Sequence, residues 1–294
     1  MSLFNLPLSV ILSQLMLGVV NGAFYAVLSL GLAIIFGLLH VMNFAHGAFY
    51  MLGAFSAWMG LNYFGFDYWW MLIVGPVGVA VIGMALEWFA LRRLYSIDPL
   101  YGMLLTFGFA LFLEGMMRAF YGVSGKTFSA PSALEGVVDL GFMFMPRYRL
   151  WVLCVSLGVC IGTWLLIEKT RLGSYLRAAT ENPRLVEAFG INVPIMVTLT
   201  YGFGVFLAAF AGVLSAPIVQ LSPLMGMNLI IVVFAVVVIA GMGSIGGAIV
   251  TGLALGVVEG LTRIIYPEAV TTVVFLVMGL ILLVRPAGLF GTQR

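Results

Sequence analysis

A segment of mixed charge, from Glu168 to Pro194, is the part of this 294-residue chain best suited to recognise a soluble partner. Acidic and basic side chains alternate there with small residues, and Gly190 can end a helix in a left-handed turn. A short helix of this kind can lie in a groove of another protein while its charges set the register. We expect a docking helix around residues 173–190, with a solvated linker as the alternative. The candidate coupling residues are Gly173, Arg177, Ala178, Ala179, Asn182, Ala188 and Gly190.

A second group of polar residues lies between two apolar stretches. Both histidines of the chain, His40 and His46, are in it, together with Asn43. Asn43 suits the N-cap of a helix that begins at Phe44, and Gly47 allows another helix to approach closely. Polar groups in apolar surroundings are costly unless they cap a helix, contact water or contact a ligand. The segment is therefore either a satisfied helix break or a broken helix that lines a substrate path, with Asn43, His46 and Gly47 as candidates.

A glycine-rich stretch follows the apolar residues before position 240. Such a backbone either packs tightly against a neighbouring helix or leaves the helical conformation altogether. In the second case its bare peptide groups can face a substrate path. The candidate residues are Gly241, Gly243, Ser244, Gly246 and Gly247.

Two acidic residues stand four positions before an arginine, Glu114 before Arg118 and Glu259 before Arg263. This spacing and order favour an ion pair on a helix surface. Apart from Glu87, which precedes Arg92 and Arg93, the apolar spans offer no carboxylate without such a partner. Proton or ion coupling would need one, so the pattern argues against a secondary transporter.

The first pair belongs to a pattern that occurs twice. Equal spacing in two spans expected to run in the same direction suggests two related halves, an arrangement in which the substrate site lies at the repeat interface. The matching residues are Thr106, Glu114, Gly115, Arg118 and Tyr121 in the first copy and Thr251, Glu259, Gly260, Arg263 and Tyr266 in the second.

The sequence contains no catalytic set. It has no phosphate-binding glycine loop, no histidine pair at metal-ligand spacing, and no serine–histidine–aspartate candidate. Cys154 and Cys160 lie six apart in one apolar stretch and therefore on different faces of a helix, so we expect packing residues. We expect no enzyme activity, no metal and no bound cofactor.

The elements that must position these residues are transmembrane helices. Hydrophobic residues make up 63% of the chain and charged residues 8%, and the mean hydropathy is +1.17. A soluble protein cannot bury that much apolar area, and inside a bilayer every backbone group must bond internally. We expect an all-α polytopic bundle of about eight or nine spans, forming one domain over residues 1–294. The apolar windows are near 8–38, 44–64, 69–91, 100–121, 149–167, 194–219, 225–243, 246–264 and 269–285.

Basic residues predict the orientation of these spans. Arg92–Arg93, the 168–194 loop and the tail from Arg285 carry the basic clusters, which favours the cytoplasm for all three. The loop over residues 122–148, rich in Gly, Ser and Pro, then lies on the periplasmic side. The N-terminus is outside if both early windows span, and inside if one is re-entrant.

Taken together, these motifs resemble the branched-chain amino acid (Leu/Ile/Val) permeases of bacterial ATP-binding-cassette importers, nearly end to end. In one departure, Arg177 stands where the general importer loop has the glutamate of Glu-Ala-Ala. The residues that carry the resemblance are Gly31-Leu32, Asn43–Gly47, Leu172-Gly173, Arg177-Ala178, Asn182, Ala188, Gly190-Ile191, Gly241–Gly247 and Arg285–Gly291.

The resemblance implies a multi-pass protein of the bacterial inner membrane that forms the translocation pathway. Its implied partners are a homologous second permease, two cytoplasmic ATPase subunits that use the ATP, a periplasmic substrate-binding protein and the lipid bilayer, with no nucleic acid. The same family also imports urea, short amides and other small acids, so these substrates remain alternatives. An ion-coupled secondary transporter or channel is a different class, and it would need no docking loop.

Overall fold

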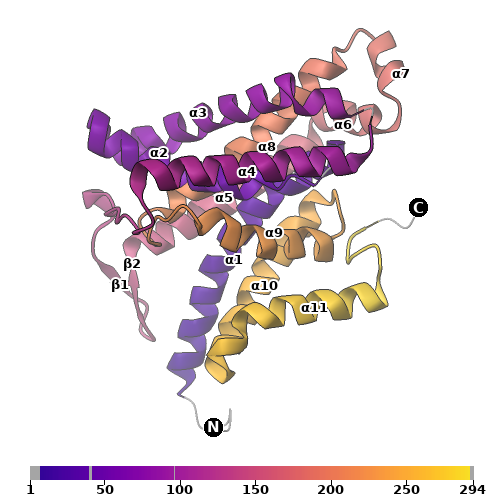
Figure 1. Ribbon diagram of the computed structural model, residues 1–294. Coiled ribbons are helices and arrows are strands. Elements are labelled where there is room, and N and C mark those ends of the chain that lie inside the picture. Colours follow the sequence, from indigo (N-terminus) through magenta and orange to yellow (C-terminus); the bar gives the residue numbers. More distant parts are fainter. Residues whose placement is uncertain (1–6, 40–41, 96, 292–294) are drawn as a thin grey trace.

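The computed structural model describes residues 7–39, 42–95 and 97–291, which are almost entirely helical (Figure 1). The only sheet in this described part is a short antiparallel hairpin, in which Val138 pairs with Met145. The helices are α1 Leu8–Leu39, α2 Ala45–Phe64, α3 Tyr68–Phe89, α4 Pro99–Tyr121, α5 Arg147–Lys169, α6 Arg171–Glu181, α7 Pro183–Ala188, α8 Val193–Ser215, α9 Met225–Ala240, α10 Ile245–Ile265 and α11 Val270–Val284; the strands are β1 Val137–Asp139 and β2 Phe144–Pro146.

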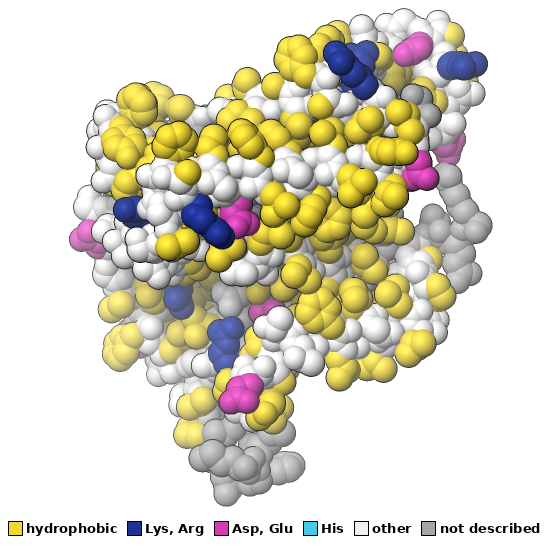
Figure 2. All heavy atoms as spheres, in the orientation of Figure 1, with side chains coloured by type: hydrophobic (Ala, Val, Ile, Leu, Met, Phe, Trp, Pro, Cys, Tyr) yellow, Lys and Arg dark blue, Asp and Glu magenta, His cyan; other side chains and the backbone are white. Residues whose placement is uncertain are grey.

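Each apolar stretch of the sequence forms one of the longer helices, α1 to α5 and α8 to α11. Within the described residues, seven are long and apolar enough to cross a membrane, α9 is apolar but shorter, and α2 lies largely buried inside the bundle. Hydrophobic side chains cover the face formed by α3, α4 and α11 (Figure 2). The chain is therefore an all-α polytopic membrane protein. The expected number of eight or nine spans is close to the seven candidate spans of the described residues.

The helix connections gather at two opposite ends of the bundle. One end carries α6, α7 and the C-terminal segment, at the right of Figure 1, and we call it the α6–α7 end. Arg92 shares a cavity there with Pro183 and Glu187, and the backbone N–H of Leu289 donates to Ile239 (2.8 Å). The three basic clusters of the sequence thus lie at one end, as expected from their charge.

The other end carries β1 and β2, and we call it the hairpin end. The backbones of Lys126 and Leu221 pair there as an isolated bridge, which ties the long loop before α5 to the connection between α8 and α9. The hydroxyls of Tyr68 and Tyr148, in the first turns of α3 and α5, lie 2.7 Å apart. The 122–148 loop expected opposite the basic clusters is therefore found at the hairpin end.

The tightest packing joins α1, α2 and α8, which we call the α1–α2–α8 core. Glycines allow this close approach: a side chain at Gly53 would collide with the backbone of Ala209, and one at Gly212 with the carbonyl of Tyr50. A second close seam joins α1 to α10, where Gly18 faces Gly256 and Gly22 faces Gly252. These contacts make α1 the central helix of the bundle.

Candidate functional site

The charged segment folds into two helices, α6 and α7, where the sequence predicted one. Asn182 interrupts the helix and caps α7, because its Oδ1 accepts from the backbone N–H of Leu185 (3.1 Å). Pro183 follows at the first helical position, where its missing N–H costs nothing. Gly190, with φ of +82°, ends α7 in the expected left-handed turn.

The α6–α7 unit packs on the start of α8 through five buried side chains: Leu176, Ala179, Val186, Val193 and Met196. The predicted coupling residues are divided by this packing. Gly173 and Ala179 are buried against the chain itself, since a side chain at Gly173 would collide with the carbonyl of Ile167. The remaining ones are exposed: Arg177, Ala178, Asn182, Ala188 and Gly190.

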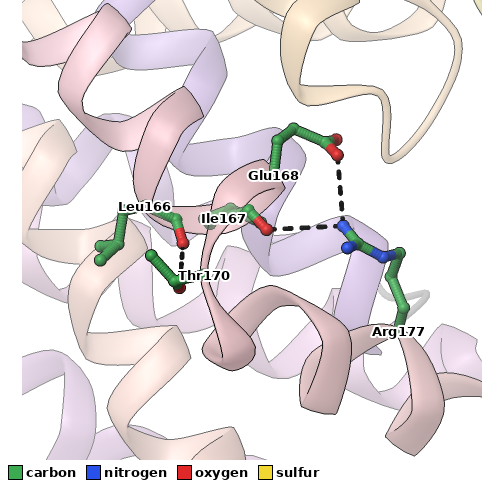
Figure 3. Close-up of polar contacts among 5 residues, drawn as sticks. All are labelled: Leu166, Ile167, Glu168, Thr170 and Arg177. Carbon is green, nitrogen blue, oxygen red and sulfur yellow. Dashed lines mark hydrogen bonds and ion pairs between the residues drawn. The ribbon is translucent and has the colours of Figure 1, made fainter.

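Arg177 fixes α6 against the end of α5 (Figure 3). Its guanidinium donates to the Glu168 carboxylate (3.4 Å) and to the carbonyl of Ile167 (3.5 Å), while the Thr170 hydroxyl donates to the carbonyl of Leu166. The side chains of Arg177 and Glu168 are 54% and 42% exposed, so water weakens their attraction. The pair orients the helix and adds little stability.

Four exposed apolar side chains on this unit are not among the predicted coupling residues. Leu172, Tyr175, Leu185 and Phe189 are 44%, 42%, 56% and 78% exposed. Leu185 and Phe189 are four residues apart, and Val186 between them is buried, so both lie on the outer face of α7. The signal for Leu185 and Phe189 in the sequence was their spacing, which places two apolar residues on the same face of a short helix.

The glycine-rich stretch is partly non-helical and lies at the same end. Gly241 and Gly243 have φ of +96° and +88°, and they form the turn between α9 and α10. The Ser244 hydroxyl caps α10 by accepting from the Gly247 N–H (3.2 Å). Of the two alternatives from the sequence, a break is found at Gly241 and Gly243, whereas Gly246 and Gly247 belong to α10.

The two turn glycines have different neighbours. Gly241 packs on the C-terminal segment, against Gly288 and Gly291, and the N–H of Phe290 donates to the Ala240 carbonyl (2.9 Å). Gly243 instead lines a cavity of about 120 Å³ together with Gly37, Arg177, Thr180 and Thr200. The structure thus brings Gly243 close to the α6–α7 unit.

Asn43 and His46 lie deep in the α1–α2–α8 core. Asn43 is 1% exposed; its amide donates to the Tyr201 hydroxyl (3.0 Å), and its Oδ1 accepts from the Ala45 N–H (3.1 Å). The expectation is wrong by one residue: the helix begins at Ala45, and its N-cap is Phe44, which makes no side-chain cap bond. Asn43 bonds the Ala45 N–H from the position before the N-cap. His40 lies outside the described residues.

His46 and Gly47 form the next contacts of the same helix. His46 is fully buried, and its Nε2–H donates to the Leu28 carbonyl (2.8 Å), which leaves Nδ1 without a hydrogen bond within the described chain. A side chain at Gly47 would meet the Gly226 carbonyl at 2.5 Å, so this glycine is required for the contact between α2 and α9. The structure keeps Asn43 and His46 apart from the cavity at Gly243, and their role on a substrate path stays a prediction.

The two expected ion pairs have different outcomes. Glu114 and Arg118 form theirs at 2.8 Å. The expectation for Glu259 is wrong: ion pairs in the described chain join Glu114 to Arg118 and Glu168 to Arg177, whereas the Glu259 carboxylate accepts from the Tyr25 hydroxyl (2.9 Å). The reason is packing, because the α1–α10 seam buries Glu259 to 4% exposure beside the tyrosine.

Glu87 is buried with both carboxylate oxygens bonded. Oε1 accepts from Tyr95 (2.9 Å), and Oε2 accepts from Thr198 (2.5 Å). Burial, with the nearby Glu87 carboxylate, raises the pKa of the Tyr95 hydroxyl above its usual value, so Tyr95 stays a hydrogen-bond donor. These bonds tie α3 to α8 at the α6–α7 end.

Comparisons with known proteins agree on one family. The family model described as branched-chain amino acid transport system, permease component, matches residues 14–284. The permease protein LivH of the high-affinity branched-chain amino acid transport system of Escherichia coli strain K12 is 29% identical over 95% of each chain. BraD of Pseudomonas aeruginosa, of the same description, is also 29% identical over 95% of each chain. A probable LivH of Methanocaldococcus jannaschii is 30% identical over 90% of this chain and 88% of its own. No solved structure matches the chain significantly.

Proposed function

The chain belongs to the family of branched-chain amino acid transport permeases, and we propose that it is the membrane subunit of an ATP-driven importer of Leu, Ile and Val. Membership makes it a non-enzymatic, multi-pass membrane protein. Two relatives of similar length are permeases of high-affinity branched-chain amino acid transport systems, which supports the substrate. Urea, short amides and other small acids remain the alternatives within the family.

The observation that carries the proposal is the outer face of the α6–α7 unit. A membrane protein that exposes Leu185 and Phe189 beside the exposed Arg184 presents two apolar anchors to the aqueous side. Anchors of this spacing fit a hydrophobic groove of a partner, and the surrounding charges set the position of the helix along that groove. The proposed occupant is a cytoplasmic ATPase subunit, one for each of two permeases, which binds and hydrolyses the ATP. An ion-coupled transporter would have no use for this surface.

The remaining partners and the path follow from the same arrangement. The α6–α7 end faces the cytoplasm of a bacterial inner membrane, and the hairpin end faces the periplasm, where a substrate-binding protein delivers the amino acid. A homologous second permease completes the pathway, to which Asn43 and the turn at Gly243 contribute. The chain acts as a single domain and binds no cofactor of its own.

The anchors can be tested without disturbing the fold. We expect Phe189→Asp and Leu185→Asp to abolish ATP-driven leucine uptake by the complete transporter, because a buried carboxylate cannot be accommodated in an apolar groove. Ala188→Arg, on the same exposed face, should act similarly. Ala179, which the sequence also suggested, is a poor test because it is buried within the chain.

The measurement is uptake into proteoliposomes, with co-purification of the ATPase from solubilised membranes. Val219→Asp is the matched control, since Val219 is an apolar residue, 42% exposed, in the connection before α9 at the hairpin end. Uptake and co-purification at wild-type levels in all three docking variants would overturn the coupling role of this surface.

A further inference from the structure

One face of α10 carries a row of polar side chains near the hairpin end. Thr251, Glu259 and Arg263 are separated by eight and four residues, so they share one side of the helix. Arg263 is exposed, and Glu259 is 4% exposed. The row therefore runs from the surface into the seam between α10 and α1.

Glu259 retains hydrogen-bonding capacity that the other buried carboxylate has used. Both oxygens of Glu87 accept from hydroxyl groups, whereas Glu259 accepts from Tyr25 through Oε2 and, in the described chain, through no other donor. Arg263 has no ion pair in the same part of the chain, so its five N–H donors are available. Glu259 and Arg263 thus lie one helical turn apart, near enough to attract each other, but they form no ion pair within 4.0 Å.

The seam beside this pair contains other polar atoms without partners. In the described residues, the side-chain oxygens of Gln14 and Ser29 on α1 and of Thr251 on α10 are buried and have no hydrogen bond. Nearly all buried polar groups in proteins are paired, so each of these atoms requires an explanation. The glycine contacts leave no space for a solute to pass along the seam, but Gln14 lies against Gly260, next to Glu259, where a ligand bound at the end of the seam would be close to it.

The geometry points to a function for this pair that deepens, and rests on, the proposed transport of amino acids. We propose that Glu259 and Arg263 bind the two charged groups of the substrate at the periplasmic mouth, Glu259 the ammonium and Arg263 the carboxylate. An α-amino acid carries both charges about one carbon apart, and side chains at i and i+4 lie about 5–6 Å apart at their Cβ atoms. Charge-assisted hydrogen bonds to both groups replace the water that the zwitterion loses.

Tyr25 has a specific part in this site. Its hydroxyl holds one oxygen of the carboxylate within the seam, which prevents Glu259 from closing onto Arg263. The corresponding pair on α4 has no such tyrosine bond, and there Glu114 and Arg118 join at 2.8 Å. The same spacing therefore gives a closed pair on α4 and an open pair on α10.

The test is leucine uptake by the complete transporter in proteoliposomes that contain the ATPase and binding-protein partners. We expect Glu259→Gln and Arg263→Gln each to lower the initial uptake rate about tenfold or more, because each removes a charge-assisted bond. Uptake is compared per assembled transporter, measured by size-exclusion chromatography of the same samples. Glu114→Gln and Arg118→Gln are the matched controls, and both should take up leucine nearly as the wild type does.

Each outcome decides the proposal. Wild-type uptake by Arg263→Gln overturns it, even if Glu259→Gln fails to assemble, because the exposed arginine can be replaced without disturbing the seam. An equal loss of leucine uptake in the α4 controls also overturns it, since breaking any charged pair at this spacing would then be enough to slow transport. Absence of uptake of Leu, Ile and Val by the wild-type transporter instead contradicts the proposed function, and the site falls with it.

Discussion

The α1–α2–α8 core and the α6–α7 unit differ in how closely their helices approach. In the core, Gly53 and Gly212 leave no room for a Cβ, because the backbone of the facing helix occupies that space. The α6–α7 unit rests on a thin apolar layer around Ala179, and cavities of about 120 and 350 Å³ lie beside α6. The core has no free space at these contacts, whereas the α6–α7 unit has cavities beside it.

Because of this difference, substitutions in the two regions should affect different properties, namely stability in the core and transport in the α6–α7 unit. A change in the core alters the free energy of folding, because dense packing has no space to absorb it. A change on the outer face of α6 or α7 should leave folding nearly unaltered, so that it tests the proposed docking to a partner. Transport alone does not distinguish these effects, so stability is measured for every variant below and uptake as well for those that test a role in transport.

The largest effect is expected for Gly212→Leu. The new side chain would occupy the position of the Tyr50 carbonyl, so α2 and α8 must move apart. We expect destabilisation of about 3 kcal/mol or more, at the upper end of the range for overpacked cores. Thermal unfolding followed by size-exclusion chromatography in detergent measures it.

Gly108→Leu is the control for this substitution. Gly108 lies on the exposed side of α4 with nothing within 4 Å of a Cβ, so the same change adds a side chain without a collision. It should unfold at nearly the wild-type temperature. Equal behaviour of the two variants would show that close packing does not distinguish the core from the lipid-facing helices.

An intermediate effect is expected for Asn43→Leu. The substitution leaves the Tyr201 hydroxyl and the Ala45 N–H without their partner, at a cost of about 1–3 kcal/mol. The double variant Asn43→Leu, Tyr201→Phe should be destabilised by less than the sum of the two single changes, because it no longer carries a buried hydroxyl without a hydrogen bond.

Uptake per folded molecule decides whether Asn43 also contributes to the path. A purely structural residue lowers the amount of folded transporter and leaves the rate of each molecule unchanged. A sharp fall in that rate would place Asn43 on the substrate route. An additive double variant would contradict the coupling between Asn43 and Tyr201.

The sequence predicted local features better than their surroundings. Gly190 and the break after Gly241 were found because positive φ favours glycine whatever lies nearby. The interruption at Asn182 was missed although Asn182 followed by Pro183 is a local signal for the start of a new helix. The bond of Glu259 to Tyr25 joins residues 234 positions apart, and spacing along one helix carries no information about that contact.

The smallest effect on stability is expected for Arg177→Gln, and it tests the comparison most finely. Because the pair with Glu168 is largely exposed, its loss should change the free energy of unfolding by less than about 1 kcal/mol. Arg177 nevertheless joins α6 to the last turn of α5, so its loss should loosen the link by which motion of the docking helices reaches the bundle. We therefore expect more ATP hydrolysed per leucine imported at an unchanged unfolding temperature.

Glu168→Gln should give the same change, and Arg184→Gln, whose side chain is exposed on α7, should give none. A fall in unfolding temperature like that of Asn43→Leu would show that the α6–α7 unit is held as rigidly as the core.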